Sequence, residues 1–332
     1  MSGLNPRLLR PRRWRPPRAP RRGGTPLPPL RLLALPAAGP EDVVVAADGR
    51  LLTGVADGSI LRVDPATGAV ETLANTGGRP LGLHACEDGS VLVCDSVRGL
   101  LRVPADGSHV EVLVGSVDGV PLNFASNVVA DEDGTIYFSA STRRFDLEHY
   151  LGDILEHSGT GRLFRRDPSG AVETLLDGLQ FANGVVLAPD RSCVLVAQTG
   201  AFCVTRYWLT GPNAGTADTL IDNLPGSPDN MALGSDGLVW VSLPSARNAL
   251  LDRLLSLPGL VRQLVWLLPD RLRPAPARTA YVLGVALDGE IVQELRRDDG
   301  DYAFVTSVLE HDGALYLGAL HEPAIAVTTV PR

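Results

Sequence analysis

Acidic and amide side chains open four strand-forming runs that lie far apart in this 332-residue chain. The residues are Glu41, Asn127, Asn183 and Asp229, with Asn230 directly after it. A single Asn or Asp at the start of a strand is most often a turn-former that hydrogen-bonds its own backbone. Four such residues at the same position of four runs indicate a shared role. Carboxylate and amide oxygens are the ligands that Ca²⁺ prefers and Zn²⁺ does not. If the fold gathers the four runs, they predict a site for Ca²⁺ or another hard divalent cation.

The four runs belong to a repeat of six units that spans most of the chain. In each unit a strand-forming run meets a tight turn, and a second strand follows. The turns are Asp48-Gly49, Asp88-Gly89, Asp133-Gly134, Pro189-Asp190, Asp236-Gly237 and Asp312-Gly313. Units of four short antiparallel strands cannot bury their own apolar faces, so they close into a ring whose innermost strands line one channel. The sequence therefore predicts an all-β fold, a six-bladed β-propeller, with the four runs meeting at one channel mouth.

The two ends of the chain are expected to close the ring together. The sixth unit, which begins at Val305, shows only three strands, and the run from Leu30 to Leu35 supplies the missing outer strand. Such closure leaves no exposed edge between the first and last blades. Residues 30–332 are therefore predicted to form the propeller, whereas the Arg- and Pro-rich residues 1–29 are predicted to be a disordered tail.

Two insertions interrupt the repeat between the second and third strands of their blades. Residues at about 145–157 and 247–270 carry apolar side chains at helical spacing, and the second stretch is kinked at Pro258-Gly259. In a propeller this connection falls on the face where the innermost strands begin, so the helices are expected to cover the channel mouth as a lid. Two other interpretations of the 250–268 helix stay open: contact with another subunit, giving an oligomer, and contact with a membrane surface.

Composition excludes several classes of function. All 30 residues counted as Lys or Arg are arginine, which excludes Schiff-base chemistry on lysine and a phosphate loop of the Walker type. A net charge of −8 gives no reason to expect nucleic-acid binding, and no apolar run is long enough to span a membrane. No apolar export signal follows the Arg-rich start, so we expect a cytoplasmic protein with reduced cysteines and a small-molecule substrate.

Segments spread over all six units resemble the strictosidine synthase-like branch of a six-bladed propeller superfamily. They are Gly39-Pro40-Glu41-Asp42, Arg79-Pro80-Leu81-Gly82-Leu83, Gly161-Arg162-Leu163, Phe181-Ala182-Asn183-Gly184-Val185, Tyr207-Trp208-Leu209, Asp222-Asn223-Leu224-Pro225-Gly226, Pro228-Asp229-Asn230 and Glu310-His311-Asp312-Gly313. The superfamily also contains the gluconolactonases related to senescence marker protein 30 and the paraoxonases. The resemblance covers about residues 30–330. It implies an axial Ca²⁺ held by Glu41, Asn127, Asn183 and Asp229, with Asn230 matching the paired Asn of paraoxonases.

Three departures from the family patterns bear on the activity. Strictosidine synthases carry a catalytic Glu on the first strand of blade six, where this chain has Thr306 and offers Glu310 four residues later. Paraoxonases carry a catalytic His at the start of blade two, where Leu81 stands and His84 follows three residues on. Gluconolactonases often have Asn-Asp in blade three, whereas here the second residue is Val128. Without the catalytic Glu, the condensation that strictosidine synthases catalyse would lack its acid/base. Without the Asp of blade three, binding of a sugar acid is not favoured.

These observations favour a Ca²⁺-dependent hydrolase of lactones or esters, with an apolar substrate because the lid is apolar. The metal would polarise the substrate carbonyl, and Asp229 is the candidate general base. His84, Thr306 and Tyr150 are candidate residues of the substrate pocket. Two alternatives stay open: a metal-free condensing enzyme or lyase of the strictosidine synthase type, and a propeller that binds a partner without catalysis.

Overall fold

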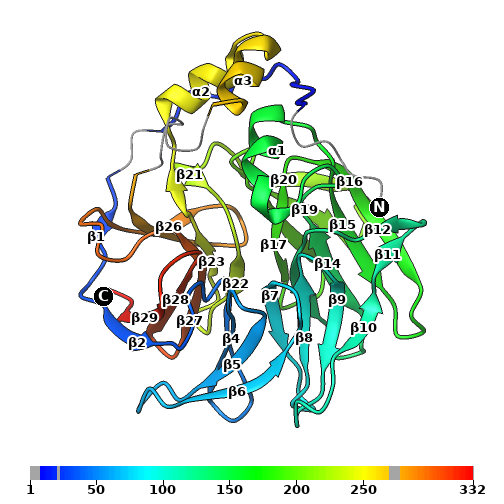
Figure 1. Ribbon diagram of the computed structural model, residues 1–332, viewed down its shortest axis with the longest axis vertical. Coiled ribbons are helices and arrows are strands. Elements are labelled where there is room, and N and C mark those ends of the chain that lie inside the picture. Colours follow the sequence, from blue (N-terminus) through cyan, green and yellow to red (C-terminus); the bar gives the residue numbers. More distant parts are fainter. Residues whose placement is uncertain (1–7, 21–22, 269–276, 332) are drawn as a thin grey trace.

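Six antiparallel sheets surround a central axis in the computed structural model, which describes residues 8–20, 23–268 and 277–331 (Figure 1). Each sheet is one blade. The first strand of every blade contacts the first strand of its neighbours, so these six strands form a closed inner ring. The predicted six-bladed β-propeller is confirmed.

The strands follow one another within each blade from the axis outward. Blades one and two contain β3 (Val43–Val45), β4 (Leu51–Gly54), β5 (Ser59–Val63), β6 (Val70–Asn75), β7 (Pro80–Ala85), β8 (Val91–Asp95), β9 (Gly99–Val103) and β10 (Glu111–Val114). Blades three and four contain β13 (Ala125–Ala130), β14 (Ile136–Ala140), β15 (Gly161–Arg166), β16 (Val172–Leu179), β17 (Ala182–Leu187), β18 (Cys193–Gln198), β19 (Cys203–Trp208) and β20 (Ala217–Ile221).

The last two blades also take strands from the N-terminal part of the chain. Blade five contains β22 (Met231–Leu233), β23 (Val239–Ser242), β25 (Ala280–Val285) and β26 (Ile291–Arg297), with β1 (Thr25–Pro26) parallel to β26. Blade six contains β27 (Val305–His311), β28 (Ala314–Ala319), β29 (Ala324–Thr329) and β2 (Arg31–Ala34). Two short ribbons pair β11 (Ser116–Val117) with β12 (Val120–Pro121) and β21 (Gly226–Ser227) with β24 (Ser245–Ala246).

The Asp-Gly turns join the first and second strands, as the repeat predicts. Gly49 has φ +78° and Gly134 φ +86°, a left-handed conformation that costs glycine nothing. The preceding aspartate stabilises the turn: Asp133 Oδ1 accepts the backbone N–H of Thr135 at 2.8 Å. These local bonds explain why a tight turn recurs at the same place in each unit.

The ring closes through β2, as predicted. Strand β2 runs antiparallel to β29, with Leu33 opposite Ile325. Leu33 is buried and packs with Val43 and Leu61 of blade one, so one N-terminal strand joins the last blade to the first. Apolar side chains fill the spaces between the other blades in the same way; Leu92 and Leu100 of blade two, for example, share one buried cluster with Phe138 of blade three.

A helical layer covers one end of the propeller (Figure 1). The first insertion forms the short 3₁₀ helix η1 (Leu147–His149) and helix α1 (Tyr150–Glu156), and the second forms α2 (Ala249–Ser256) and α3 (Gly259–Trp266). Pro258 separates α2 from α3, at the predicted kink. The two insertions share a small apolar core, which contains Phe145, Leu155, Leu254 and Trp266. The predicted lid is thus a helical layer in which α3 packs on α1.

The N-terminal segment 8–20 makes defined contacts with this helical layer. The Arg12 N–H donates to the Glu156 carbonyl at 2.8 Å. The Trp14 ring stacks on His157 with centroids 4.2 Å apart, and Leu9 is buried in the shared apolar core. The sequence predicts a disordered tail over residues 1–29, whereas here segment 8–20 packs on the helices and β1 pairs with blade five. Residues 1–7, 21 and 22 of this stretch lie outside the described residues.

Among the helices that the described residues form, none is long and apolar enough to cross a membrane. The four cysteines Cys86, Cys94, Cys193 and Cys203 are free thiols. The predicted cytoplasmic location stays a prediction.

Candidate metal centre

The polar residues that open the inner strands meet on the propeller axis. Asn127 Nδ2 donates to Asn230 Oδ1 at 3.0 Å, and Asn230 Nδ2 donates to Glu41 Oε2 at 3.0 Å. Asn183 Nδ2 donates to Asp229 Oδ1. All five side chains are buried. The structure therefore brings together every residue that the sequence predicts as a metal ligand.

Irregular strand pairing surrounds the two amide residues Asn127 and Asn183. The register between the first two strands shifts between Ala125 and Val128 in blade three and between Ala182 and Val185 in blade four. Blades two and six have the same shift, between Pro80 and Leu83 and between Val305 and Ser307. A bulge of this kind bends a strand and redirects a side chain. Asn127 and Asn183 thus lie within bulges, whereas Glu41, Asp229 and Asn230 lie just before β3 and β22.

Two glycines let the inner strands approach closely beside the cluster. A Cβ on Gly82 would lie 2.4 Å from the Asn127 Cα, and a Cβ on Gly184 would lie 2.5 Å from the Met231 nitrogen. Both distances are far below contact distance, and the opposing atoms belong to backbone. Glycine is therefore required where β7 meets β13 and where β17 meets the segment that carries Asp229.

Asp42 is a sixth member of the cluster, and sequence reasoning missed it. Its Oδ2 accepts the Leu83 N–H at 2.9 Å and the Asn127 side-chain amide at 3.4 Å. Its Oδ1 accepts the Ser307 hydroxyl at 2.7 Å and the Val43 N–H at 2.9 Å. Asp42 thereby links blades one, two, three and six. The sequence signal for it is the pair of adjacent acidic residues, Glu41 and Asp42, directly before β3.

The cluster holds more negative charge than its surroundings neutralise. Burial and the nearby Asp229 and Asp42 raise the pKa of Glu41 well above its usual value, and Arg79 offsets this only in part. Burial, with a contribution from Asp42, raises the pKa of Asp229 to about 7 despite the hydrogen bond from Asn183. Burial also raises the pKa of Asp42. A cation between these groups would relieve both the desolvation and the repulsion.

The donor set fits a hard cation that binds amide as well as carboxylate oxygens. Within the described residues, no three acidic, imidazole or thiol groups lie together closely enough to hold a metal by themselves. A metal on the axis would therefore need the amide oxygens of Asn127, Asn183 and Asn230. Asn127 Oδ1 already accepts the Val185 N–H at 2.9 Å, but an amide oxygen has a second lone pair. Mixed carboxylate and amide coordination is typical of Ca²⁺ and Mg²⁺ rather than Zn²⁺.

Apolar side chains cover the cluster on the side of the helical layer. Leu81, Phe124 and Phe181 from blades two to four pack with Tyr150 and with the neighbouring Leu147 and Ile154. The Phe124 and Phe181 rings meet edge to face at 5.3 Å. Burial and the charge of Asp229 raise the pKa of Tyr150. Tyr150 belongs to the apolar group over the cluster, and its role in a substrate pocket stays a prediction.

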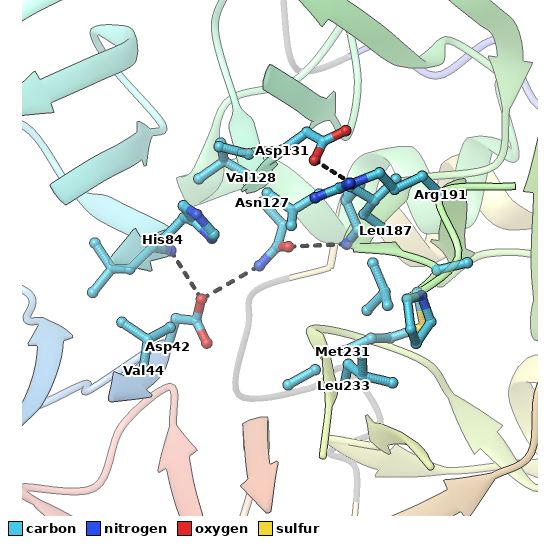
Figure 2. A pocket seen from close by; sticks show the side chains of 18 of the residues that line it. Asp42, Val44, His84, Asn127, Val128, Asp131, Leu187, Arg191, Met231 and Leu233 are labelled. Atoms are coloured by element: carbon cyan, nitrogen blue, oxygen red, sulfur yellow. Dashed lines mark hydrogen bonds and ion pairs between the residues drawn. The ribbon is translucent and has the colours of Figure 1, made fainter. Parts of the chain in front are cut away.

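The other two predicted pocket residues differ in position: Thr306 lies beside Glu41, and His84 lies farther along the inner strand of blade two. The Thr306 hydroxyl donates to the Glu41 carbonyl at 2.7 Å, so it braces the backbone of the cluster. His84 lines a cavity of about 350 Å³ on the far side of the cluster from the lid, and burial lowers its pKa to about 4. Figure 2 shows this cavity, with Asp42 and Asn127 on its wall and the Asp131–Arg191 ion pair (2.7 Å) at its rim.

The fold and the site together describe a class of protein: a six-bladed propeller with buried carboxylate and amide side chains on its axis, under a helical layer. Comparisons with known proteins identify the family. The strictosidine synthase family model matches residues 126–212, and the strictosidine synthase-like N-terminal model matches residues 26–63. Adipocyte plasma membrane-associated protein of Mus musculus is 33% identical over 319 residues, 89% of this chain and 76% of the relative. Protein STRICTOSIDINE SYNTHASE-LIKE 10 of Arabidopsis thaliana is 34% identical over 316 residues, 89% and 83% respectively. The chain belongs to the strictosidine synthase-like family.

Solved structures agree on the fold. A gluconolactonase from Xanthomonas campestris has a TM-score of 0.64 at 18% identity, covering 92% of this chain and 91% of its own. The calcium-binding protein regucalcin from Agrobacterium tumefaciens has a TM-score of 0.64 at 13% identity, covering 92% and 95%. At these identities the similarity concerns the propeller itself.

Proposed function

We propose that the protein is a Ca²⁺-dependent hydrolase of lactones or esters that favours apolar substrates. The observation that carries the proposal is the buried axial cluster, in which three carboxylates and three side-chain amides lie together with little compensating positive charge. The proposal is also supported by two structural neighbours, which are a gluconolactonase and a calcium-binding regucalcin.

The ligands in this proposal are Glu41, Asn127, Asn183, Asp229 and Asn230, with Asp42 holding the inner strands around them. When bound, Ca²⁺ supplies Lewis-acid polarisation of the substrate carbonyl and charge for the developing oxyanion. The carboxylates provide the negative charge that such an ion requires, and the amides complete the oxygen set.

Asp229 acts as the general base. It takes a proton from a water that adds to the carbonyl carbon, and the C–O bond of the ester or lactone then breaks. The leaving oxygen receives that proton, which yields a carboxylic acid and an alcohol. Asn183 orients the carboxylate through its hydrogen bond to Oδ1. Tyr150, Phe124 and Phe181 exclude bulk water and receive the apolar part of the substrate.

The condensing-enzyme alternative has weaker support at its critical position. Thr306 stands where strictosidine synthases carry their catalytic Glu, and its hydroxyl is bonded to a backbone carbonyl. Glu310 lies near the opposite end of β27, where it accepts the Gly313 N–H at 2.7 Å and the Ser235 hydroxyl at 2.9 Å. Neither residue offers an acid/base beside the axial cluster.

The test compares two substitutions at hydrogen-bonded neighbours. Asp229→Asn keeps an oxygen of similar position but removes the base, so turnover should fall by about 10²–10⁴-fold and should not recover with added Ca²⁺. Asn183→Ala removes one oxygen that water can replace, so excess Ca²⁺ should restore part of its activity. The assay is a panel of aryl esters and of lactones from five-membered to long-chain.

Either of two results would contradict the proposal. Full activity of Asp229→Asn would exclude the proposed base. If the wild-type protein binds Ca²⁺ yet turns over no member of the panel, the binding or condensing alternatives would be preferred.

A further inference from the structure

Leucine side chains stand exposed along the outer face of the second insertion. Leu250 is 55% exposed on α2, and Leu260, Leu264 and Leu267 on and after α3 are 72%, 59% and 58% exposed. Positions 260, 264 and 267 follow the spacing of one helical stripe. Their neighbours Leu254, Leu255 and Trp266 point inward and are buried, so the stripe is not needed for packing within the chain.

Exposed arginines lie beside this stripe on the N-terminal segment. Arg10, Arg12, Arg13, Arg15 and Arg18 are exposed, and Arg253 of α2 adds another. The exposed acidic residues near this end are fewer: Asp146 and Glu148, on and before η1, Asp177, which pairs with Arg143, and Asp222, next to the Asn223 that contacts Arg18. The lid end is therefore locally positive, although the whole chain carries a net charge of −8.

Buried contacts hold the segment and the helices in one arrangement. The Arg262 guanidinium is buried in α3 and donates to the Leu155 carbonyl at 2.9 Å and to the Arg12 carbonyl at 2.7 Å. Arg247 donates to the Pro17 carbonyl at 2.7 Å. Figure 1 shows α2 and α3 at the outermost end of the molecule, with the N-terminal segment beside them. The arginines and leucines thus form one fixed surface, which we call the cap surface.

We propose that the cap surface docks on an anionic lipid membrane. A helix pair that presents leucines with flanking arginines has the pattern of an interfacial anchor, in which apolar side chains enter the acyl boundary and arginines meet lipid phosphates. A second protein copy fits less well, because two identical cap surfaces would bring their arginines together. The negative charge of the propeller body would turn this end toward the membrane. The inference goes beyond the proposed activity and does not depend on it.

The experiment measures binding of the whole protein to vesicles by co-sedimentation. Vesicles of phosphatidylcholine with 30% phosphatidylserine should bind the wild-type protein at least tenfold more tightly than vesicles of phosphatidylcholine alone, and raised salt should weaken the binding. The variant Leu260→Ser/Leu264→Ser/Leu267→Ser should lose at least tenfold in partitioning. The matched control Leu32→Ser/Val112→Ser/Val292→Ser changes three side chains with similar exposure on outer strands and should bind like wild type.

A second variant guards against loss of folding. Leu264→Asp places one charge on an exposed position, so it should keep the wild-type thermal transition and still lose vesicle binding. The inference is overturned if wild-type protein does not bind the anionic vesicles, or if the leucine variants bind as the control does. It is also overturned if wild type sediments as a dimer that the leucine substitutions split, since the surface would then join two copies.

Discussion

Asp42 shows how one buried side chain organises the axial site. It accepts four hydrogen bonds, from Leu83, Asn127, Val43 and Ser307, so it fixes the positions of inner strands from four blades. At the same time its charge raises the pKa values of Glu41 and Asp229. The hydrogen bonds of Asp42 therefore stabilise the ring of inner strands. Its charge destabilises the cluster when no cation is bound, because it repels Glu41 and Asp229.

Asp42→Asn should separate these two effects. The amide keeps one acceptor oxygen but leaves a buried donor without its partner, so with Ca²⁺ present the free energy of unfolding should fall by about 1–3 kcal/mol. In EGTA the loss should be smaller, because the substitution also removes repulsion from Glu41 and Asp229. Urea unfolding with and without Ca²⁺ measures both values. Equal losses in the two conditions would contradict the role given to the charge.

The positions of the cluster residues could be predicted from the sequence only in part. The repeat predicted that Glu41, Asn127, Asn183, Asp229 and Asn230 lie at one channel mouth, because the innermost strands of all blades begin at the same end of the channel. It could not show that Asp42 also reaches the axis. Two adjacent residues on a regular strand face opposite sides, but Glu41 and Asp42 both lie before β3 begins at Val43, and Asp42 is held by partners on other blades.

At the scale of elements, the bulges and the helical layer have different physical origins. Two of the bulges, in blades two and four, contain a glycine at a close contact between backbones, Gly82 and Gly184. The helices are fixed by apolar side chains, and their spacing alone predicted them. The N-terminal segment was not predicted to pack, because its Arg- and Pro-rich composition says nothing of a docking surface that α1, α2 and α3 create far away in the sequence.

His157 makes the contact between the N-terminal segment and the helical layer sensitive to acid. Burial, with the nearby Arg262 and Arg12, lowers its pKa to about 4. The packed state therefore favours the neutral ring. The contribution of this preference to the stability of the packed state is complete above pH 6.5 and is lost as the pH falls from 6.5 toward 4. The shift corresponds to about 3 kcal/mol. Asp153, whose pKa burial raises to about 6, acts with the opposite sign, because its protonation favours the packed state.

Hydrogen exchange tests this pH dependence. The backbone amides of Arg12 and Trp14, which donate to Glu156 and Leu255, should lose protection between pH 6.5 and 4.5 after correction for the intrinsic exchange rate. The variant His157→Phe keeps an aromatic ring against Trp14 and cannot titrate. In this variant the two amides should stay protected between pH 6.5 and 4.5. Identical pH profiles for the two proteins would exclude His157 as the cause.

At the scale of the whole molecule, the closed ring makes the N-terminal strand indispensable. Deleting residues 1–22 should remove the contacts of segment 8–20 and leave the propeller folded, because β2 remains paired with β29. Deleting residues 1–35 should remove β2, uncover the edge of β29 and expose the apolar groups that Leu33 covers, which favours aggregation. Size-exclusion chromatography and thermal unfolding compare the two proteins. Equal solubility and stability would contradict closure by β2.

The fold was predictable in more detail than the site because it rests on repetition. Six similar units each carry the same turn and strand pattern, so a misread strand in one unit is corrected by the other five. The pairing of Arg31–Ala34 with blade six followed from counting strands. The site depends instead on single contacts between units, such as the Asn127–Asn230 and Asn183–Asp229 pairs, and no repeat specifies which partner an amide selects.

Calcium content and its effect on stability test the axial cluster most directly. Elemental analysis of purified protein should give one tightly bound Ca²⁺ for each chain. Removal by EGTA should lower the melting temperature, because Glu41, Asp42 and Asp229 then repel one another in a buried site, and Ca²⁺ but not Zn²⁺ should restore it. A protein that holds no calcium and whose melting temperature is unchanged by EGTA would contradict a metal centre on the propeller axis.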